Sequence, residues 1–146
     1  IIRVLNEDGQ ALVASPAYLD RHGRPRTPED LARLDSVDMA RSGGEHVWRL
    51  TSPDGGVRNI PHQPRLTTDD MVTLRRAALD GVGAVQLPLF VIGQDIAAGT
   101  LETLLPRWAS ASWLVHAVFP SRRGLVPAVR TFLDVLAEDF AAPHPC

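Results

Sequence analysis

The chain of 146 residues lacks the features that stabilise small secreted or metal-dependent folds. Its single cysteine, Cys146, is the last residue. One thiol cannot close an internal disulfide or build a cysteine-based zinc site, so both scaffolds are excluded and a reducing compartment, the cytoplasm, is expected. No apolar run approaches the roughly 20 residues of a membrane span. The first residues do not resemble a signal peptide, and we expect no membrane partner.

Positive charge is sparse and dispersed. The chain has no lysine, and many of its arginines lie in short groups within residues 21–26, 75–76 and 122–123. The formal net charge is −2. Nucleic-acid-binding domains usually carry a basic stripe and a strongly basic balance, because they must neutralise phosphates. We therefore do not expect this chain itself to bind DNA.

The residues that are present predict a packed α/β fold. Hydrophobic residues make up 45% and charged residues 22% of the chain, which is typical of a folded core. The length suffices for one domain or two small lobes. Helix starts are marked by a capping residue followed by proline or acids. They predict helices that begin at Ser15-Pro16, Thr27-Pro28, Thr68-Asp69-Asp70, Pro88 and Pro127, with ends at Gly23, Gly81 and Gly99 for the first, third and fourth.

Short apolar or alternating runs between these helices predict strands. They cover residues 11–14, 36–39, 46–51, 57–60, 65–67, 82–87, 101–105 and 113–119. The strands on either side of residues 52–56 form a predicted hairpin, with Trp48 and Leu50 on one face. Residues 65–87 form a predicted βαβ unit, so part of the sheet is expected to be parallel. The buried face of the last helix is expected to comprise Val129, Phe132, Leu133, Leu136 and Phe140.

Seven motifs follow one another along the chain. They are residues 14–31 (ASPAYLDRHGRPRTPEDL), 48–50 (WRL), 66–70 (LTTDD), 77–88 (AALDGVGAVQLP), 98–101 (AGTL), 104–108 (LLPRW) and 117–123 (AVFPSRR). No single motif is diagnostic, but together they cover nearly the whole chain. In order and spacing the series resembles the effector-binding, or substrate-binding, domain of LysR-type transcriptional regulators, in truncated form.

The resemblance implies a fold like that of type 2 periplasmic binding proteins, in which two α/β lobes are joined by two crossing strands. Residues 15–103 would form the complete second lobe. Residues 1–14 and 104–146 would be the remaining part of the first lobe. The winged helix-turn-helix of a whole regulator would be absent from this chain. The surviving first-lobe strands would have unpaired edges, which favour pairing with another chain.

The implied function is to sense a small, anionic metabolite between the lobes and so to control transcription, with no enzymatic activity and no cofactor. DNA would be a partner only through the N-terminal domain of the parent protein, and dimers or tetramers are expected. An alternative interpretation is a solute-binding receptor of the same fold that serves transport. A third is a hydrolase or lyase that would use Ser15, or Asp69 and Asp70.

The implied ligand contacts lie where strands lead into helices, and they are Ser15, Leu66, Thr67, Thr68, Gln86, Leu87 and Pro88. A helix N-terminus offers N–H groups and a partial positive charge, which suit an anion. Ligands in open α/β sheets bind at the carboxyl ends of strands. Residues 86–88 are therefore expected beside Thr67 and Thr68. The alternative is that Ser15 and Thr68 are only N-caps.

Other candidate sites have simpler structural explanations. Asp69 and Asp70 would point in different directions on a helix, and acids in a first turn favour the helix dipole. The histidines show no HxH or HExxH spacing, so no metal site is expected. Ser15 lacks the GxSxG context of a catalytic serine. Residues 81–83 lack the third glycine of a dinucleotide loop, and they are expected to end a helix and pack a strand.

Overall fold

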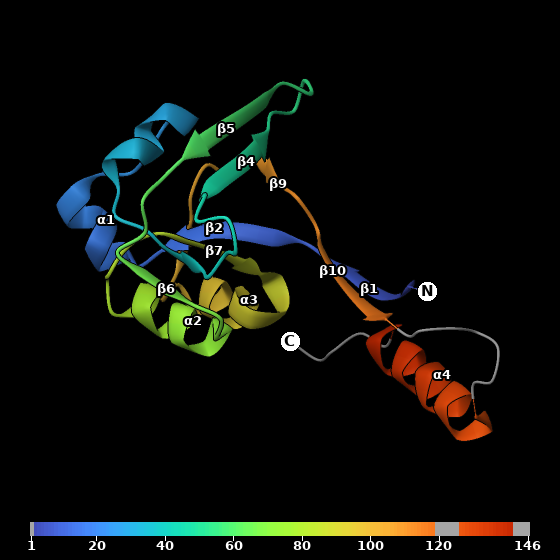
Figure 1. Cartoon of the computed structure of the whole chain (residues 1–146). Coiled ribbons are helices and arrows are strands. Elements are labelled where there is room, and N and C mark those ends of the chain that lie inside the picture. Colours follow the sequence, from blue (N-terminus) through green and yellow to red (C-terminus); the bar gives the residue numbers. More distant parts are fainter. Residues whose placement is uncertain (1, 119–125, 142–146) are drawn as a thin grey trace. The chain divides into compact units, whose positions relative to one another are not determined.

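The computed structural model describes residues 2–118 and 126–141, which form two compact units (Figure 1). The larger unit comprises Gly9–Ala111, and the smaller one combines residues up to Asp8 with those from Ser112. The larger unit contains all of residues 15–103, together with 9–14 and 104–111. The assignment of the two units to lobes stays a prediction. The predictions made for Phe119 and Cys146 fall outside the described residues.

A mixed sheet runs through the larger unit, in the strand order β6–β3–β7–β2–β8. Its strands are β2 (Gln10–Ala14), β3 (Val37–Met39), β6 (Leu66–Thr68), β7 (Val85–Pro88) and β8 (Glu102–Thr103). β3 is parallel to β6, and a parallel bridge between Ser36 and Ala84 joins β3 to β7. β2 is antiparallel to both β7 and β8. The predicted parallel βαβ unit is confirmed, with β3 inserted between its two strands.

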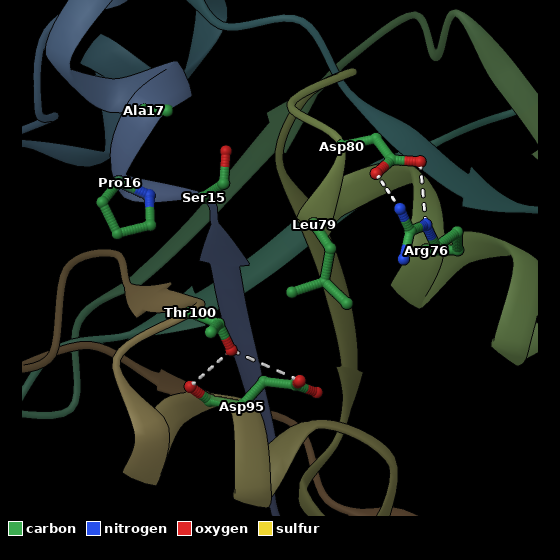
Figure 2. Close-up of a pocket in the computed structure, with 8 residues that line it drawn as sticks. All are labelled: Ser15, Pro16, Ala17, Arg76, Leu79, Asp80, Asp95 and Thr100. Atoms are coloured by element: carbon green, nitrogen blue, oxygen red, sulfur yellow. Dashed lines mark hydrogen bonds and ion pairs between the residues drawn. The ribbon is translucent and has the colours of Figure 1, made fainter.

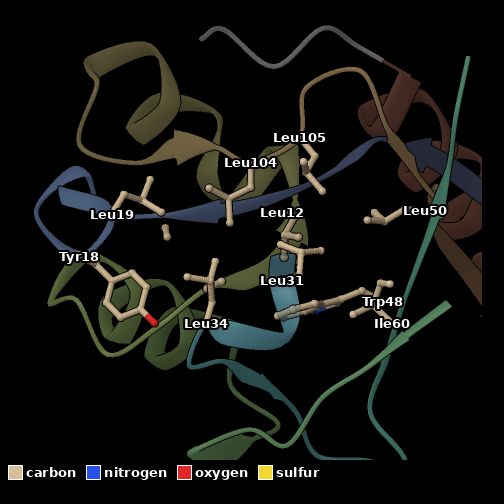
Figure 3. Packing of buried hydrophobic residues seen from close by; sticks show 12 residues of the cluster. Leu12, Tyr18, Leu19, Leu31, Leu34, Trp48, Leu50, Ile60, Leu104 and Leu105 are labelled. Atoms are coloured by element: carbon tan, nitrogen blue, oxygen red, sulfur yellow. The ribbon is translucent and has the colours of Figure 1, made fainter. Parts of the chain in front are cut away.

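The sheet is buried on both faces because its strands alternate between two hydrophobic clusters. On β2, Ala11 and Val13 pack in the cluster that includes residues of α2 (Met71–Leu79) and α3 (Leu89–Ala98). Leu12 and Ala14 belong to the opposite cluster, with residues of α1 (Pro16–His22) and of the 3-10 helix η1 (Pro28–Arg33) (Figure 3). This alternation is the period-two pattern of a strand that is covered on both sides.

The predicted hairpin forms a second, smaller sheet. β4 (Val47–Thr51) and β5 (Val57–Pro61) are antiparallel, and β9 (Ala109–Ser110) pairs with the other edge of β4. Trp48 and Leu50 are each 1% exposed and share a cluster with Leu12, so their predicted common face is confirmed. The hairpin is thereby packed against the side of the main sheet that α1 also covers.

The two glycines before β7 have different structural roles. Gly81 ends α2 with φ of 77°, a left-handed conformation that favours glycine. At Gly83 a Cβ atom would lie 2.5 Å from the carbonyl oxygen of Asp35. Only a residue without a side chain lets the chain before β7 lie this close to the chain before β3. The prediction that these glycines end a helix and pack a strand is confirmed.

The smaller unit pairs β1 (Ile2–Asp8) with β10 (Trp113–Val118), antiparallel, and contains α4 (Pro127–Ala141). The helix begins where it was predicted, but its burial differs. Of its predicted apolar face only Leu133 is buried, whereas Val129 is 40% and Phe132 61% exposed. A two-stranded sheet and one helix offer too little surface to cover a whole helix face. The predicted strand 101–105 is also shorter, since only β8 is extended there.

No helix within the described ranges 2–118 and 126–141 is both long and apolar enough to cross a membrane.

Candidate functional site

The predicted ligand residues lie at two opposite ends of the main sheet. β6, β3 and β7 point the same way, so Thr68 and Pro88 lie at its carboxyl edge. β2 runs against β7, with Gln10 opposite Pro88 and Val13 opposite Val85. Ser15 therefore lies at the other end, about five residues or roughly 17 Å from Pro88 along the strand direction. The structure brings Thr67, Thr68 and residues 86–88 to one edge, with Leu66 at the start of β6, and leaves Ser15 out.

At this carboxyl edge the two groups of residues are not direct neighbours. β3 separates β6 from β7, and Met39 is the register partner of Thr68. The expectation that residues 86–88 lie directly beside Thr67 and Thr68 is wrong by one strand. Two strand spacings amount to roughly 10 Å, a span that a single small ligand can bridge. Sequence periodicity could not show this insertion, because it reports which residues are extended but not which strands pair.

The start of α2 differs from the prediction, because Asp70 rather than Thr68 is its N-cap. The Asp70 carboxylate accepts hydrogen bonds from the backbone N–H groups of Val72 and Thr73, at 3.1 and 3.2 Å. Hydrogen bonds from the Thr73 hydroxyl and from these N–H groups lower the pKa of Asp70. Thr68 supports the turn, since its hydroxyl accepts from the Asp70 N–H. The explanation of Asp70 as a structural acid is confirmed.

This cap has a consequence for ligand chemistry. A carboxylate of the protein already occupies the N-terminal N–H groups of α2, where an anionic ligand was expected. α3 differs, because its N-cap is Pro88, which provides no capping side chain, and the Leu89 backbone N–H donates to the Gly9 carbonyl at 2.9 Å. Leu89 and Phe90, in the first turn of α3, are 40% and 57% exposed. The N-cap residue of α3, unlike that of α2, therefore brings no negative charge to the positive end of its helix dipole.

The predicted contacts at this edge differ in what they can offer. Thr67 is exposed, and Leu66, Thr68 and Gln86 are half-buried, so their side chains can reach a ligand. Leu87 is 1% exposed and packs in the core, and Pro88 is also buried. These last two residues can present little more than backbone to the edge.

Ser15 lies instead on an open groove of about 560 Å³ at the opposite end of the sheet (Figure 2). The groove is lined by the start of α1 and by the ends of α2 and α3. Its polar groups already have partners. Ser15 Oγ accepts the Tyr18 N–H at 3.3 Å, as the N-cap alternative predicted, and Arg76 pairs with Asp80 at 2.7 Å. The polar side chains that line this groove are therefore already paired within the protein.

A buried polar cluster that sequence inspection missed lies on the hairpin side of β3. Asp38 Oδ2 is 2.7 Å from His46 Nδ1 and 3.7 Å from His62 Nε2. The signal was available in the hairpin itself, because pairing of Val47 with Pro61 places His46 opposite His62. In the described part of the chain, no three histidine, cysteine or acidic side chains are placed to hold a metal ion.

The sequence matches the profile of the LysR substrate binding domain over residues 1–141. The chain belongs to this family. As a LysR substrate-binding domain it is 31% identical to the HTH-type transcriptional regulator PtxR of Pseudomonas aeruginosa and 33% identical to CrgA of Neisseria meningitidis serogroup B. Both alignments cover 129 residues, 88% of this chain, and 41% and 42% of those proteins. The chain thus spans about two fifths of the length of these curated relatives.

Solved structures place the fold of this LysR substrate-binding domain among regulatory domains. The regulatory domain of CrgA from Neisseria meningitidis superposes with a TM-score of 0.77 at 30% identity, over 96% of this chain and 68% of that one. A variant of the AphB regulatory domain from Vibrio vulnificus gives a TM-score of 0.81 at 25% identity, over 94% and 68% of the two chains. The predicted fold, like a type 2 periplasmic binding protein, is confirmed.

Proposed function

We propose that this chain is the effector-sensing part of a LysR-type regulator of transcription. Family membership and the named relatives, which are regulators of transcription, support this assignment. The effector site is proposed at the carboxyl edge of β6, β3 and β7. The observation that supports it is that Thr67, Thr68 and Gln86 reach the surface at this edge, where α3 also starts. A bound effector would favour one arrangement of the parent protein, because differential affinity for two states shifts their populations.

The chemistry of this edge favours a small carboxylic acid as effector. The N-cap of α3 is the uncharged Pro88, and the positive end of the helix dipole favours an anionic group nearby. The exposed side chains of Leu89 and Phe90 in the same turn suit an apolar or aromatic body. Threonine hydroxyls and the Gln86 amide supply hydrogen bonds. Because Asp70 occupies the start of α2, the acid group belongs at α3 rather than at α2, where it was first expected.

The transport alternative is not favoured, because the relatives named above are regulators of transcription. An enzymatic role is not proposed either. Ser15 is an N-cap and is 5% exposed, and Asp70 is committed to the N–H groups of α2. A nucleophile needs an accessible oxygen and an adjacent base, and a carboxylate that caps a helix is engaged in structure.

DNA would bind through another part of the parent protein, and a cytoplasmic location is expected for such a regulator. Dimers or tetramers are expected, and exposed apolar side chains on the smaller unit, among them Leu114, Phe132 and Val135, are consistent with self-association. Sedimentation velocity at increasing concentrations of the chain tests this, since a constant monomeric sedimentation coefficient would contradict it.

A thermal-shift screen of aliphatic and aromatic carboxylic acids tests the effector proposal. The parent protein is used, as wild type, as the Thr67→Ala/Thr68→Ala double variant and as Gln86→Ala. Ser15→Ala, at the opposite end of the sheet, is the matched control. We expect an acid that raises the melting temperature of wild type and of Ser15→Ala, with the rise lost or halved in the other two variants. A rise lost only in Ser15→Ala would move the site to the groove, and no rise across the panel would contradict a carboxylic acid effector.

A further inference from the structure

The buried cluster around Asp38 joins the hairpin to the main sheet. Asp38 lies on β3 and is 4% exposed. His46 precedes β4 and His62 follows β5, and the backbone N–H of His62 donates to the backbone carbonyl of His46 at 2.9 Å. One carboxylate oxygen of Asp38, Oδ2, faces both imidazole rings. Two histidines that flank the hairpin therefore lie beside a single carboxylate oxygen of β3, and only His46 is within hydrogen-bond distance of it.

The His62 ring is almost completely buried. Its side chain is 3% exposed and stacks on Trp48, with ring centroids 3.9 Å apart. Nδ1 lies 2.7 Å from Ser36 Oγ, whereas Nε2 is buried without a hydrogen-bond partner. The indole Nε1 of Trp48 is buried and unpartnered in the same way. Because burial disfavours a charged ring, the pKa of His62 is lowered to about 4.

The charges around the His62 ring do not offset the effect of its burial on the pKa. The charged or titratable groups that face His62 are Asp38 and Arg41, from β3 and the turn after it, and His46, from the approach to β4. Arg41 Nε already lies 3.5 Å from Asp38 Oδ2. Ser36 and Trp48, which contact the His62 ring, are uncharged. Asp35, next to Ser36 in the sequence, forms an ion pair with Arg65. A protonated His62 would be a buried cation without a carboxylate of its own.

We propose that Asp38, His46 and His62 form an acid-sensitive latch that holds the hairpin β4–β5 on β3. At neutral pH the His62 ring is uncharged and packs between Trp48 and Ser36. Acid places a proton on it, and the charged ring reaches water only if the hairpin moves away from β3. Asp38 is the register partner of Thr67, so the latch adjoins the effector edge. That last link rests on the proposed function, whereas the latch itself does not.

The direction of the pH dependence follows from where the proton binds. The open hairpin binds it near the ordinary histidine pKa of 6.5, and the closed hairpin only near pH 4. The closed state is therefore fully favoured above about pH 6.5 and loses stability as the pH falls from there toward 4. One linked proton changes the open-to-closed ratio by about tenfold per pH unit in this window, or roughly 20-fold between pH 7 and pH 5.

Amide hydrogen exchange of the chain between pH 7 and pH 5 tests the latch. We expect protection factors of the β4 and β5 amides to fall roughly 20-fold, while those of α2 hold within about threefold. In His62→Gln the hairpin should lose most of this pH dependence. His116→Gln, at an exposed histidine of β10, is the control that should behave as wild type. Equal losses in the hairpin and α2, or an unchanged loss in His62→Gln, would overturn the proposal.

Ring nitrogen chemical shifts of the unmodified chain supply a measurement that needs no variant. A pH titration followed by two-dimensional proton–nitrogen spectra should show that the His62 ring binds its proton well below pH 6. The exposed His116 of the same chain is the internal reference. Titration of His62 near pH 6.5 in the folded chain would contradict an enclosed ring and would overturn the latch. Neither experiment uses an effector, so its outcome is independent of whether the effector site is placed correctly.

Discussion

Arg75 and Asp95 join α2 to α3 through two hydrogen bonds, from Nε to Oδ2 at 2.6 Å and from Nη2 to Oδ1 at 2.7 Å. The Asp95 side chain is 9% exposed, whereas that of Arg75 is 38% exposed and retains part of its hydration. This geometry is the bidentate arrangement in which an arginine–carboxylate pair is strongest. It fixes the relative position of the two helices that cover one face of the main sheet.

Loss of the Asp95 charge should therefore destabilise the larger unit. We expect Asp95→Asn to lower the free energy of unfolding by about 1–2 kcal/mol, because two charge-assisted hydrogen bonds are weakened. The control is Asp80→Asn, which removes the exposed pair with Arg76 and should cost less than about 0.5 kcal/mol. Urea unfolding followed by circular dichroism gives both values. Equal effects of the two variants would show that the Asp95 pair has no special role.

The same pair predicts a pH dependence of stability. The hydrogen bonds from Arg75 lower the pKa of Asp95 below its ordinary 3.8. The folded state therefore binds a proton less readily than the unfolded state, and the contribution of Asp95 is present above about pH 4 and lost below it. The difference in unfolding free energy between wild type and Asp95→Asn should be constant from pH 5 to 7 and shrink below pH 4. A difference that grows on acidification would contradict this assignment.

Gly83 should tolerate no side chain. A Cβ atom there would lie 2.5 Å from the Asp35 carbonyl oxygen, so Gly83→Ala must push apart the segments that lead into β3 and β7. We expect a loss of about 1–3 kcal/mol of unfolding free energy. Gly93→Ala is the matched control, since a Cβ at that helical position meets nothing within 4 Å and should stabilise α3 by about 0.5–1 kcal/mol. If both variants lost stability equally, close approach at Gly83 would not be the cause.

The two adjacent acids before α2 should differ in their effects. Asp70→Ala removes the acceptor for the N–H groups of Val72 and Thr73 and should lower the midpoint of thermal unfolding. Asp69→Ala, one residue earlier, should leave the midpoint nearly unchanged. Differential scanning calorimetry of both variants measures this. A larger effect at Asp69 would contradict the assignment of Asp70 as the cap.

The sequence predicted the local features well, because their causes are local. A serine before a proline, as at Ser15-Pro16, is a local signal for a helix start, and a glycine, as at Gly99, is one for a helix end. In the structure Ser15 caps α1, and Gly99 ends α3 in the left-handed conformation. The helix that starts at Pro127 and the shared face of Trp48 and Leu50 follow from periodicity in the same way. The motif series added the family and the fold, which periodicity alone could not supply.

The features that were missed depend on long-range pairing. Nothing in residues 65–87 shows that β3 lies between β6 and β7, and this insertion moves Thr68 away from Gln86. The strand direction of β2, which sends Ser15 to the far end of the sheet, is likewise set by its partners. The hairpin register pairs His46 with His62, but their contact with Asp38 depends on how the hairpin docks.

The position of the bound effector tests the proposed function most directly. The measurement is chemical-shift mapping of backbone amides in the parent protein with an acid that raises its melting temperature. We expect the largest shifts at residues 66–68 and 86–90, the carboxyl edge and the start of α3. Shifts confined to the groove around Ser15, Leu79 and Thr100, with the carboxyl edge unmoved, would contradict the proposed effector site.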